Sequence, residues 1–175
     1  ERALLNLRRW KASPRTFISE VLGVTPDEWQ GSGLDAIAEK DRVAVRSGHG
    51  VGKTALLSWA VLWWLTTRTP CKVPVIAASA DQLRDTIWPE LGRWHAKMPK
   101  ALRLELILTA ERLEQRVDEG QEPGFATARV ASKDRPEALQ GFHSENLLVL
   151  GDEASAIEVA AFDVLTGALS SPGAK

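Results

Sequence analysis

Short apolar runs separated by polar turns predict buried strands along this chain. The runs are residues 42–46 (RVAVR), 73–79 (VPVIAAS) and 146–150 (NLLVL), and the last follows the turn-prone Gly141 and Ser144. Three further segments in the middle of the chain could also be strands. They are residues 104–108, 112–117 and 125–131, with a polar turn at 119–124 between the last two.

Longer apolar stretches predict helices between these strands. They span residues 53–67, 81–98 and 158–169, and Trp88-Pro89 should kink the second because proline lacks a backbone N–H. Strands that alternate with helices favour an α/β fold. We therefore expect a mainly parallel β-sheet flanked by helices on both faces.

Two capping signals precede the first strand. Ser13-Pro14 and Thr25-Pro26 each place a capping residue before a proline, and Glu28 would complete a capping box with Thr25. We expect two short helices in this region. Residues 1–41 then form a helical lead-in to a core at residues 42–175.

The composition bounds the class of protein. A chain of 175 residues with 44% hydrophobic residues suits one domain. Its 22 basic and 23 acidic residues leave a net charge of −1, so the chain as a whole lacks the positive charge typical of nucleic-acid-binding proteins. The single cysteine, Cys71, excludes a disulfide framework and fits the cytoplasm. The most apolar stretch, residues 55–65, is about half the length needed to cross a bilayer, so we expect no membrane association.

The segment between the first strand and the following helix fits a phosphate-loop pattern. Glycines let a backbone fold around a phosphate, whose charge then faces the N–H groups of the loop and the helix N-terminus. Lys53 would reach the β- and γ-phosphates of ATP, and the Thr54 hydroxyl would hold Mg²⁺. The alternative is an ordinary glycine turn. The loop residues are Ser47, Gly48, His49, Gly50, Val51, Gly52, Lys53 and Thr54, with serine where the first glycine usually stands.

Two carboxylates follow the last predicted strand. Asp152 and Glu153 would lie at the carboxyl end of residues 146–150, where parallel α/β sheets bind ligands. Asp152 suits the Mg²⁺ shell, and Glu153 can accept a proton from the water that attacks the γ-phosphate. The alternative is that both residues cap the helix that begins near Ala154.

The chain resembles the ATPase domain of the large terminase subunit, the DNA-packaging motor of tailed bacteriophages. Only the phosphate loop and the acidic pair are general to P-loop ATPases. Four segments carry the resemblance: PDEWQ at residues 26–30, SGHGVGKT at 47–54, IAASADQLRDTIWPEL at 76–91 and GFHSENLLVLGDEAS at 141–155.

The resemblance implies a P-loop NTPase of the ASCE type that hydrolyses ATP with Mg²⁺ to drive viral DNA into a procapsid. It also implies as partners double-stranded DNA, a portal protein, a small terminase subunit and further copies in a ring, all in the bacterial cytoplasm. On this reading the chain is an N-terminal ATPase fragment. The rest of the ATPase domain and a nuclease domain would lie beyond it.

Two positions carry further expectations from the family. Gln30 matches a glutamine that reads the adenine edge, although a surface glutamine without a role is the alternative. His49 stands where some family members place an arginine in the loop, so a charge-donating arginine must come from elsewhere. The candidates are Arg46, Arg84, Arg129 and Arg135.

Two other functions fit the same motifs. The sequence Asp-Glu-Ala-Ser at residues 152–155 resembles the acidic box of a helicase-type nucleic-acid translocase, whereas residues 141–146 favour the terminase. A nucleotide-binding switch or assembly module with little turnover is the other alternative. Measured ATPase activity separates the switch from a motor.

Overall fold

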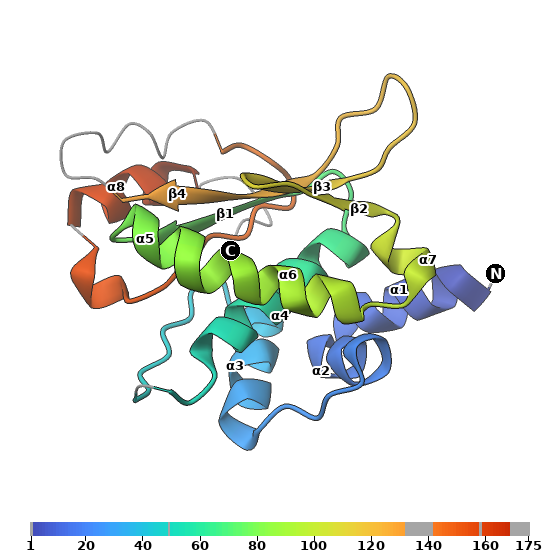
Figure 1. Ribbon diagram of the computed structural model, residues 1–175, viewed down its shortest axis with the longest axis horizontal. Coiled ribbons are helices and arrows are strands. Elements are labelled where there is room, and N and C mark those ends of the chain that lie inside the picture. Colours follow the sequence, from blue (N-terminus) through green and yellow to red (C-terminus); the bar gives the residue numbers. More distant parts are fainter. Residues whose placement is uncertain (1, 49, 132–141, 158, 169–175) are drawn as a thin grey trace.

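The computed structural model describes residues 2–48, 50–131, 142–157 and 159–168. Its centre is a five-stranded sheet with strand order β2-β3-β4-β1-β5 (Figure 1). The strands are β1 (Lys72–Ala77), β2 (Leu106–Leu108), β3 (Arg112–Gln115), β4 (Phe125–Val130) and β5 (Leu150–Gly151). β1 pairs in parallel with β4 and β5, whereas β3 pairs antiparallel with β2 and β4. The sheet is therefore mixed rather than mainly parallel as predicted, with its parallel half at the β5 edge.

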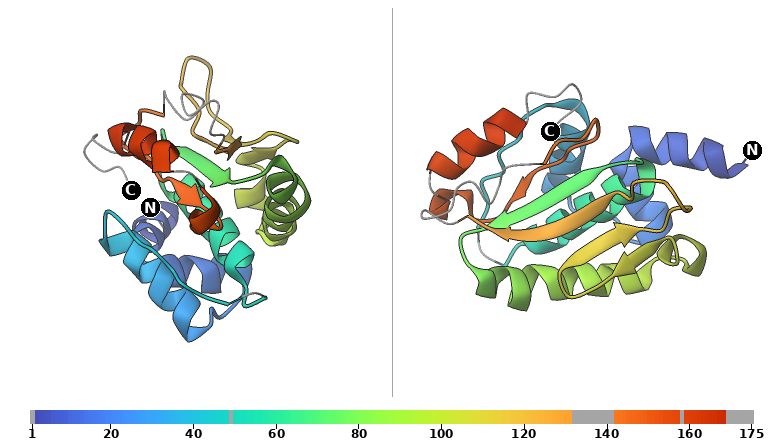
Figure 2. Two further views of the ribbon diagram at one scale, coloured as in Figure 1. Left: turned by 90° about the vertical axis from the view of Figure 1, so that its left-hand side faces the viewer. Right: turned by 90° about the horizontal axis from the view of Figure 1, so that it is seen from above.

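Helices cover both faces of the sheet, as the alternation of side chains along β1 shows. Val73 and Val75 belong to the large core shared with α4 (Lys53–Thr67) and α6 (Trp88–Lys97). Ile76 points the other way and packs with Ala161 of α8 (Val159–Ala168). Figure 2 shows α8 on the opposite side of the sheet from α4. Because β1 is buried on both faces from Val73 to Ala77, these five residues are all apolar.

Three helical segments precede the phosphate loop in the described residues, not the two predicted. They are α1 (Arg2–Ala12), α2 (Pro14–Phe17) with the π turn η1 (Ile18–Leu22), and α3 (Glu28–Glu39). The predicted cap of α2 is confirmed, since Ser13 Oγ accepts from the N–H of Thr16 at 3.2 Å. The predicted capping box of α3 is wrong by two residues. Asp27 and Gln30 form it, because Gln30 Oε1 accepts from the N–H of Asp27 at 2.9 Å.

Residues 42–46, predicted as a strand, are not in the sheet. Their backbone is irregular, and Val43 and Val45 are 39% and 43% exposed. A groove of about 1040 Å³ lies between this segment and residues 148–151, which include β5. A strand needs a neighbouring strand to satisfy its backbone groups, and no described strand lies beside this one.

The predicted strand at residues 146–150 lies beside β1, but its ladder is interrupted. The N–H of Lys72 donates to the carbonyl of Asn146 at 3.1 Å, and the carbonyl of Lys72 accepts from the N–H of Leu148 at 3.0 Å. The next residue of β1 on this side is Pro74, which has no N–H to continue the ladder. Regular pairing resumes at Val75 and Leu150, so β5 is short.

The predicted helix at residues 81–98 is not broken at Trp88-Pro89, because a wider π-helical turn precedes the proline. It consists of α5 (Ala80–Gln82), the π turn η2 (Leu83–Ile87) and α6, and α7 (Lys100–Arg103) follows. The N–H of Trp88 bonds to the carbonyl of Leu83, five residues back. The wide turn comes just before the proline that cannot join the α-helical ladder.

Among the described residues, no helix is both long and apolar enough to cross a membrane.

Candidate nucleotide site

The phosphate loop leads directly into α4. Gly50 and Gly52 have φ angles of 71° and 92°, a conformation that side chains disfavour. Gly52 is the N-cap of α4, so Lys53 and Thr54 form its first turn. Lys53 Nζ donates to the carbonyl of Gly48 at 3.0 Å, which folds the lysine back over the loop. His49, predicted as part of the loop, lies outside the described residues.

Gln30 lies under the phosphate loop and is only 5% exposed. Its Oε1 accepts from the N–H of Asp27, and its Nε2 donates to the carbonyl of Gly52 at 3.2 Å. A Cβ on Gly52 would lie 2.7 Å from that Nε2. The amide therefore links the start of α3 to the start of α4. The predicted alternative of a surface glutamine is wrong, and the adenine-reading role stays a prediction.

The acidic pair lies at the carboxyl end of β5. Asp152 is 7% exposed, and its N–H donates to the carbonyl of Ile76 at 2.9 Å. Its Oδ1 accepts from the N–H of Glu153 at 3.0 Å, and its Oδ2 accepts from Gln82 Nε2 at 2.9 Å. The Asp152 carboxylate is thus held by neutral donors.

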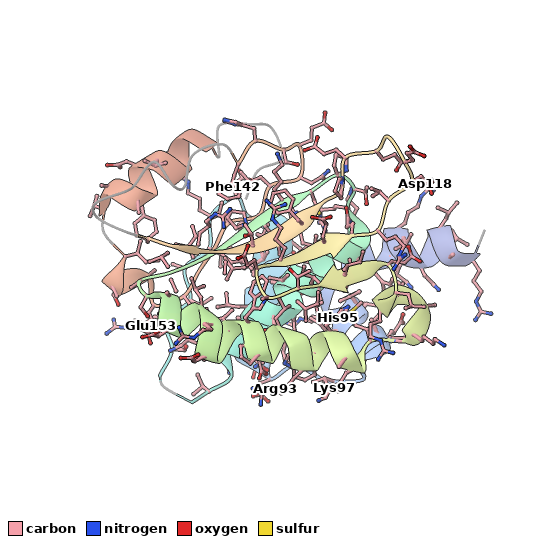
Figure 3. All side chains as sticks on the ribbon, turned by 45° about the horizontal axis from the view of Figure 1, so that its top comes forward. Arg93, His95, Lys97, Asp118, Phe142 and Glu153 are labelled. Carbon is pink, nitrogen blue, oxygen red and sulfur yellow. The ribbon has the colours of Figure 1, made fainter. Side chains whose placement is uncertain are left out.

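Glu153 is exposed and has a φ of 49°, a left-handed conformation that a non-glycine residue seldom adopts. It caps the short 3-10 helix η4 (Ala154–Ala156), and the N–H of Ala156 donates to its carbonyl at 2.8 Å. Strained backbone of this kind is common at functional sites. Figure 3 shows Glu153 near the end of the molecule where the α5–α6 helical run begins.

One cavity of about 530 Å³ brings the two motifs together. Gly50, Lys53 and Thr54 line it from the loop, and Asp152 and Glu153 line it from the end of β5. Ser47 instead lines the neighbouring groove, where its Oγ has no hydrogen-bond partner among the described residues. The remaining wall was missed by sequence reasoning, and it consists of Ser79, Asp81, Gln82, Asp85 and Thr86. Their position just after β1, at the same sheet edge, was the signal that could have found them.

The donors in this cavity fit Mg²⁺. This ion prefers oxygen ligands and usually takes one or two protein groups together with phosphates and waters. The Thr54 hydroxyl and the buried Asp152 carboxylate are such a pair, and both line the cavity. No cluster of three or more His, Cys, Asp or Glu among the described residues could hold a metal alone. A phosphate-bound ion does not need such a cluster.

None of the arginines predicted as charge donors lines this cavity in the described part of the chain. Arg46 lines the groove. Arg84 forms ion pairs with Asp81 and Asp85, each at 2.7 Å. Arg129 bonds to Thr127 Oγ1, and Arg135 lies outside the described residues.

No protein-family model matches the sequence. The chain is 31% identical over 158 residues to a probable terminase large subunit of Enterobacteria phage P7, and the match covers 86% of the chain but 31% of that relative. The resemblance to large terminase subunits is confirmed.

Solved structures of large terminases share the fold. The ATPase domain from Thermus phage P74-26 matches with a TM-score of 0.65 at 21% identity, over 90% of this chain and 65% of that one. A large terminase from a thermophilic bacteriophage, in complex with ADP, matches with a TM-score of 0.62 at 14% identity. That match covers 95% of this chain and 37% of the other. The predicted P-loop NTPase fold is confirmed.

Proposed function

We propose that this chain is the ATP-hydrolysing region of a phage terminase large subunit. The observation that carries the proposal is the meeting of the phosphate loop and the buried acidic strand end at one cavity. The fold shared with a terminase solved with ADP supports a nucleotide as the ligand.

Each residue has a role that follows from its position. Lys53 and the N–H groups of the loop bind the β- and γ-phosphates. Thr54 and Asp152 would hold Mg²⁺, which neutralises phosphate charge when bound. Glu153 orients water and accepts its proton, since its exposed carboxylate lines the same cavity. Positioning and electrostatics therefore supply the catalysis.

The cellular role we propose is translocation of double-stranded viral DNA into a procapsid in the host cytoplasm. The partners would be the portal protein, the small terminase subunit and further copies in a ring. Residues 1–41 would be the lead-in and residues 42–175 the P-loop core. The support is the sequence similarity to a large terminase subunit, of which this chain spans 31%.

Calorimetry and phosphate release test the roles. Lys53→Ala should weaken ATP binding strongly, because the lysine contacts phosphates in the ground state. Glu153→Gln should spare binding and abolish most hydrolysis, because the glutamate acts on water. Equal, large losses of affinity in both variants would contradict these assignments.

A further inference from the structure

Gln82 contacts the acidic pair from outside both sequence motifs. Its Nε2 donates to Asp152 Oδ2 at 2.9 Å across a sequence separation of 70 residues. The two residues are anchored to the same strand. The N–H of Gln82 donates to Ser79 Oγ at 3.2 Å, just after β1, and the N–H of Asp152 donates to the carbonyl of Ile76 within β1.

The two bonds to Asp152 fix the orientation of its carboxylate. Oδ1 accepts from the N–H of Glu153, and Oδ2 accepts from Gln82. A carboxylate offers about four lone-pair sites, so two neutral donors leave others free for a cation. A lysine or arginine in place of Gln82 would compete with that cation for charge. An amide holds the carboxylate and leaves its negative charge intact.

The backbone around Gln82 aims its side chain at the site. Gln82 is the last residue of α5, and the π turn η2 begins at the next residue. Asp81, Gln82, Asp85 and Thr86 all line the cavity from this segment. The segment continues into α6, which packs on α4, the helix that starts with Lys53.

We propose that Gln82 is a positioning residue that holds the Asp152 carboxylate in the orientation that binds Mg²⁺ beside a bound nucleotide. The inference rests on the proposed function and deepens it. Residues that orient a metal-binding side chain typically contribute about 10-fold or more in metal affinity.

Gln82→Met tests the proposal because it keeps the length of the side chain and removes the donor. Calorimetry measures ADP binding with Mg²⁺ and, separately, with EDTA. We expect the affinity in EDTA to stay at the wild-type value and the affinity with Mg²⁺ to fall by about 10-fold. Gln121→Met, at an exposed position in the turn between β3 and β4, is the matched control and should change neither affinity.

Gln82→Asn is a second test of the same contact, because it keeps the amide but shortens the side chain by one methylene. The same selective loss is expected. Equal losses with Mg²⁺ and EDTA, or no loss, would overturn the proposal. Failure of both variants to fold would show a structural role instead. If the wild-type protein binds no ADP, the proposed function itself fails; if it does and only the Gln82 results are negative, the failure belongs to this inference alone.

Discussion

At the scale of single residues, the buried amide of Gln30 makes a specific prediction about the phosphate loop. Both ends of the amide are bonded within the protein, to Asp27 and to Gly52. We expect Gln30→Ala to loosen the start of α4. If Gln30 acts only through this contact, ATP and GTP binding weaken by similar factors. Competition binding with both nucleotides measures this. A selective loss of ATP affinity would instead support the adenine-reading role.

Cys71 illustrates how burial makes a thiol inert. Its side chain is fully buried, and desolvation raises its pKa to about 12, although the nearby Arg68 opposes this shift. The reactive thiolate is therefore scarce at neutral pH. We expect no labelling by a thiol reagent at pH 8 in the folded protein and rapid labelling in denaturant. Fast labelling of the native protein would contradict the buried placement.

At the scale of elements, Gln115 ties the end of α4 to β3 and the start of β4. The residue is 7% exposed. Its Nε2 donates to the carbonyls of Leu65 and Arg68 at 2.5 and 2.6 Å. Its Oε1 accepts from the N–H of Gly124 at 2.9 Å. Gln115→Leu would leave these buried groups unpaired. We expect a loss of about 2–3 kcal/mol in unfolding free energy by urea denaturation. Gln121→Leu in the exposed turn should change it little.

His95 makes the packing of α6 sensitive to pH. Its Nε2 lies 3.1 Å from the carbonyl of Leu106 and 3.3 Å from that of Arg103, and desolvation by burial lowers its pKa below 6.5. The unfolded chain therefore binds a proton on His95 more readily than the folded protein does. The stability that neutral His95 contributes is full above pH 6.5 and declines as the pH falls below it. Urea titrations at pH 7.5 and 5.5 should show a larger loss for wild type than for His95→Gln. Equal losses would exclude this role.

The elements that the sequence predicted correctly are those with strong local signals. The helix of α4 follows a glycine loop and is largely apolar, and Ser13 caps α2 as expected. The errors in the strands arose where the outcome depends on distant partners. Residues 42–46 have a strand's pattern but no described strand beside them, and Pro74 interrupts a ladder whose other side lies at residues 146–150.

The same distinction holds for the candidate site. The phosphate loop and the acidic pair were predicted because each is a local motif. Gln82 was not, because its contact with Asp152 spans 70 residues and exists only after β1 and β5 pair. The position of Gln82 after β1 indicated the sheet edge, but local spacing does not show which side chain of another strand it contacts.

At the scale of the whole molecule, the cavity has an uneven charge distribution. Lys53 is the one basic residue that lines it in the described part of the chain, against Asp81, Asp85, Asp152 and Glu153. Positive charge beside the transferring phosphate is worth about 10³ to 10⁵ in rate where an arginine supplies it. We therefore expect the charge to come from a neighbouring copy when the chains assemble.

The rate of hydrolysis per subunit should then rise steeply with protein concentration. An arginine arriving from a neighbour would lower the barrier by about 4 to 7 kcal/mol. Mixing Glu153→Gln chains with chains altered at Arg46, Arg84, Arg129 or Arg135 identifies the donor. In such a mixture the Glu153→Gln chain supplies an intact arginine to a neighbour whose own Glu153 is intact, so activity returns only if the altered arginine acts across the interface. A specific activity that is high and constant from dilute monomer to assembled ring would instead place the arginine within the same subunit.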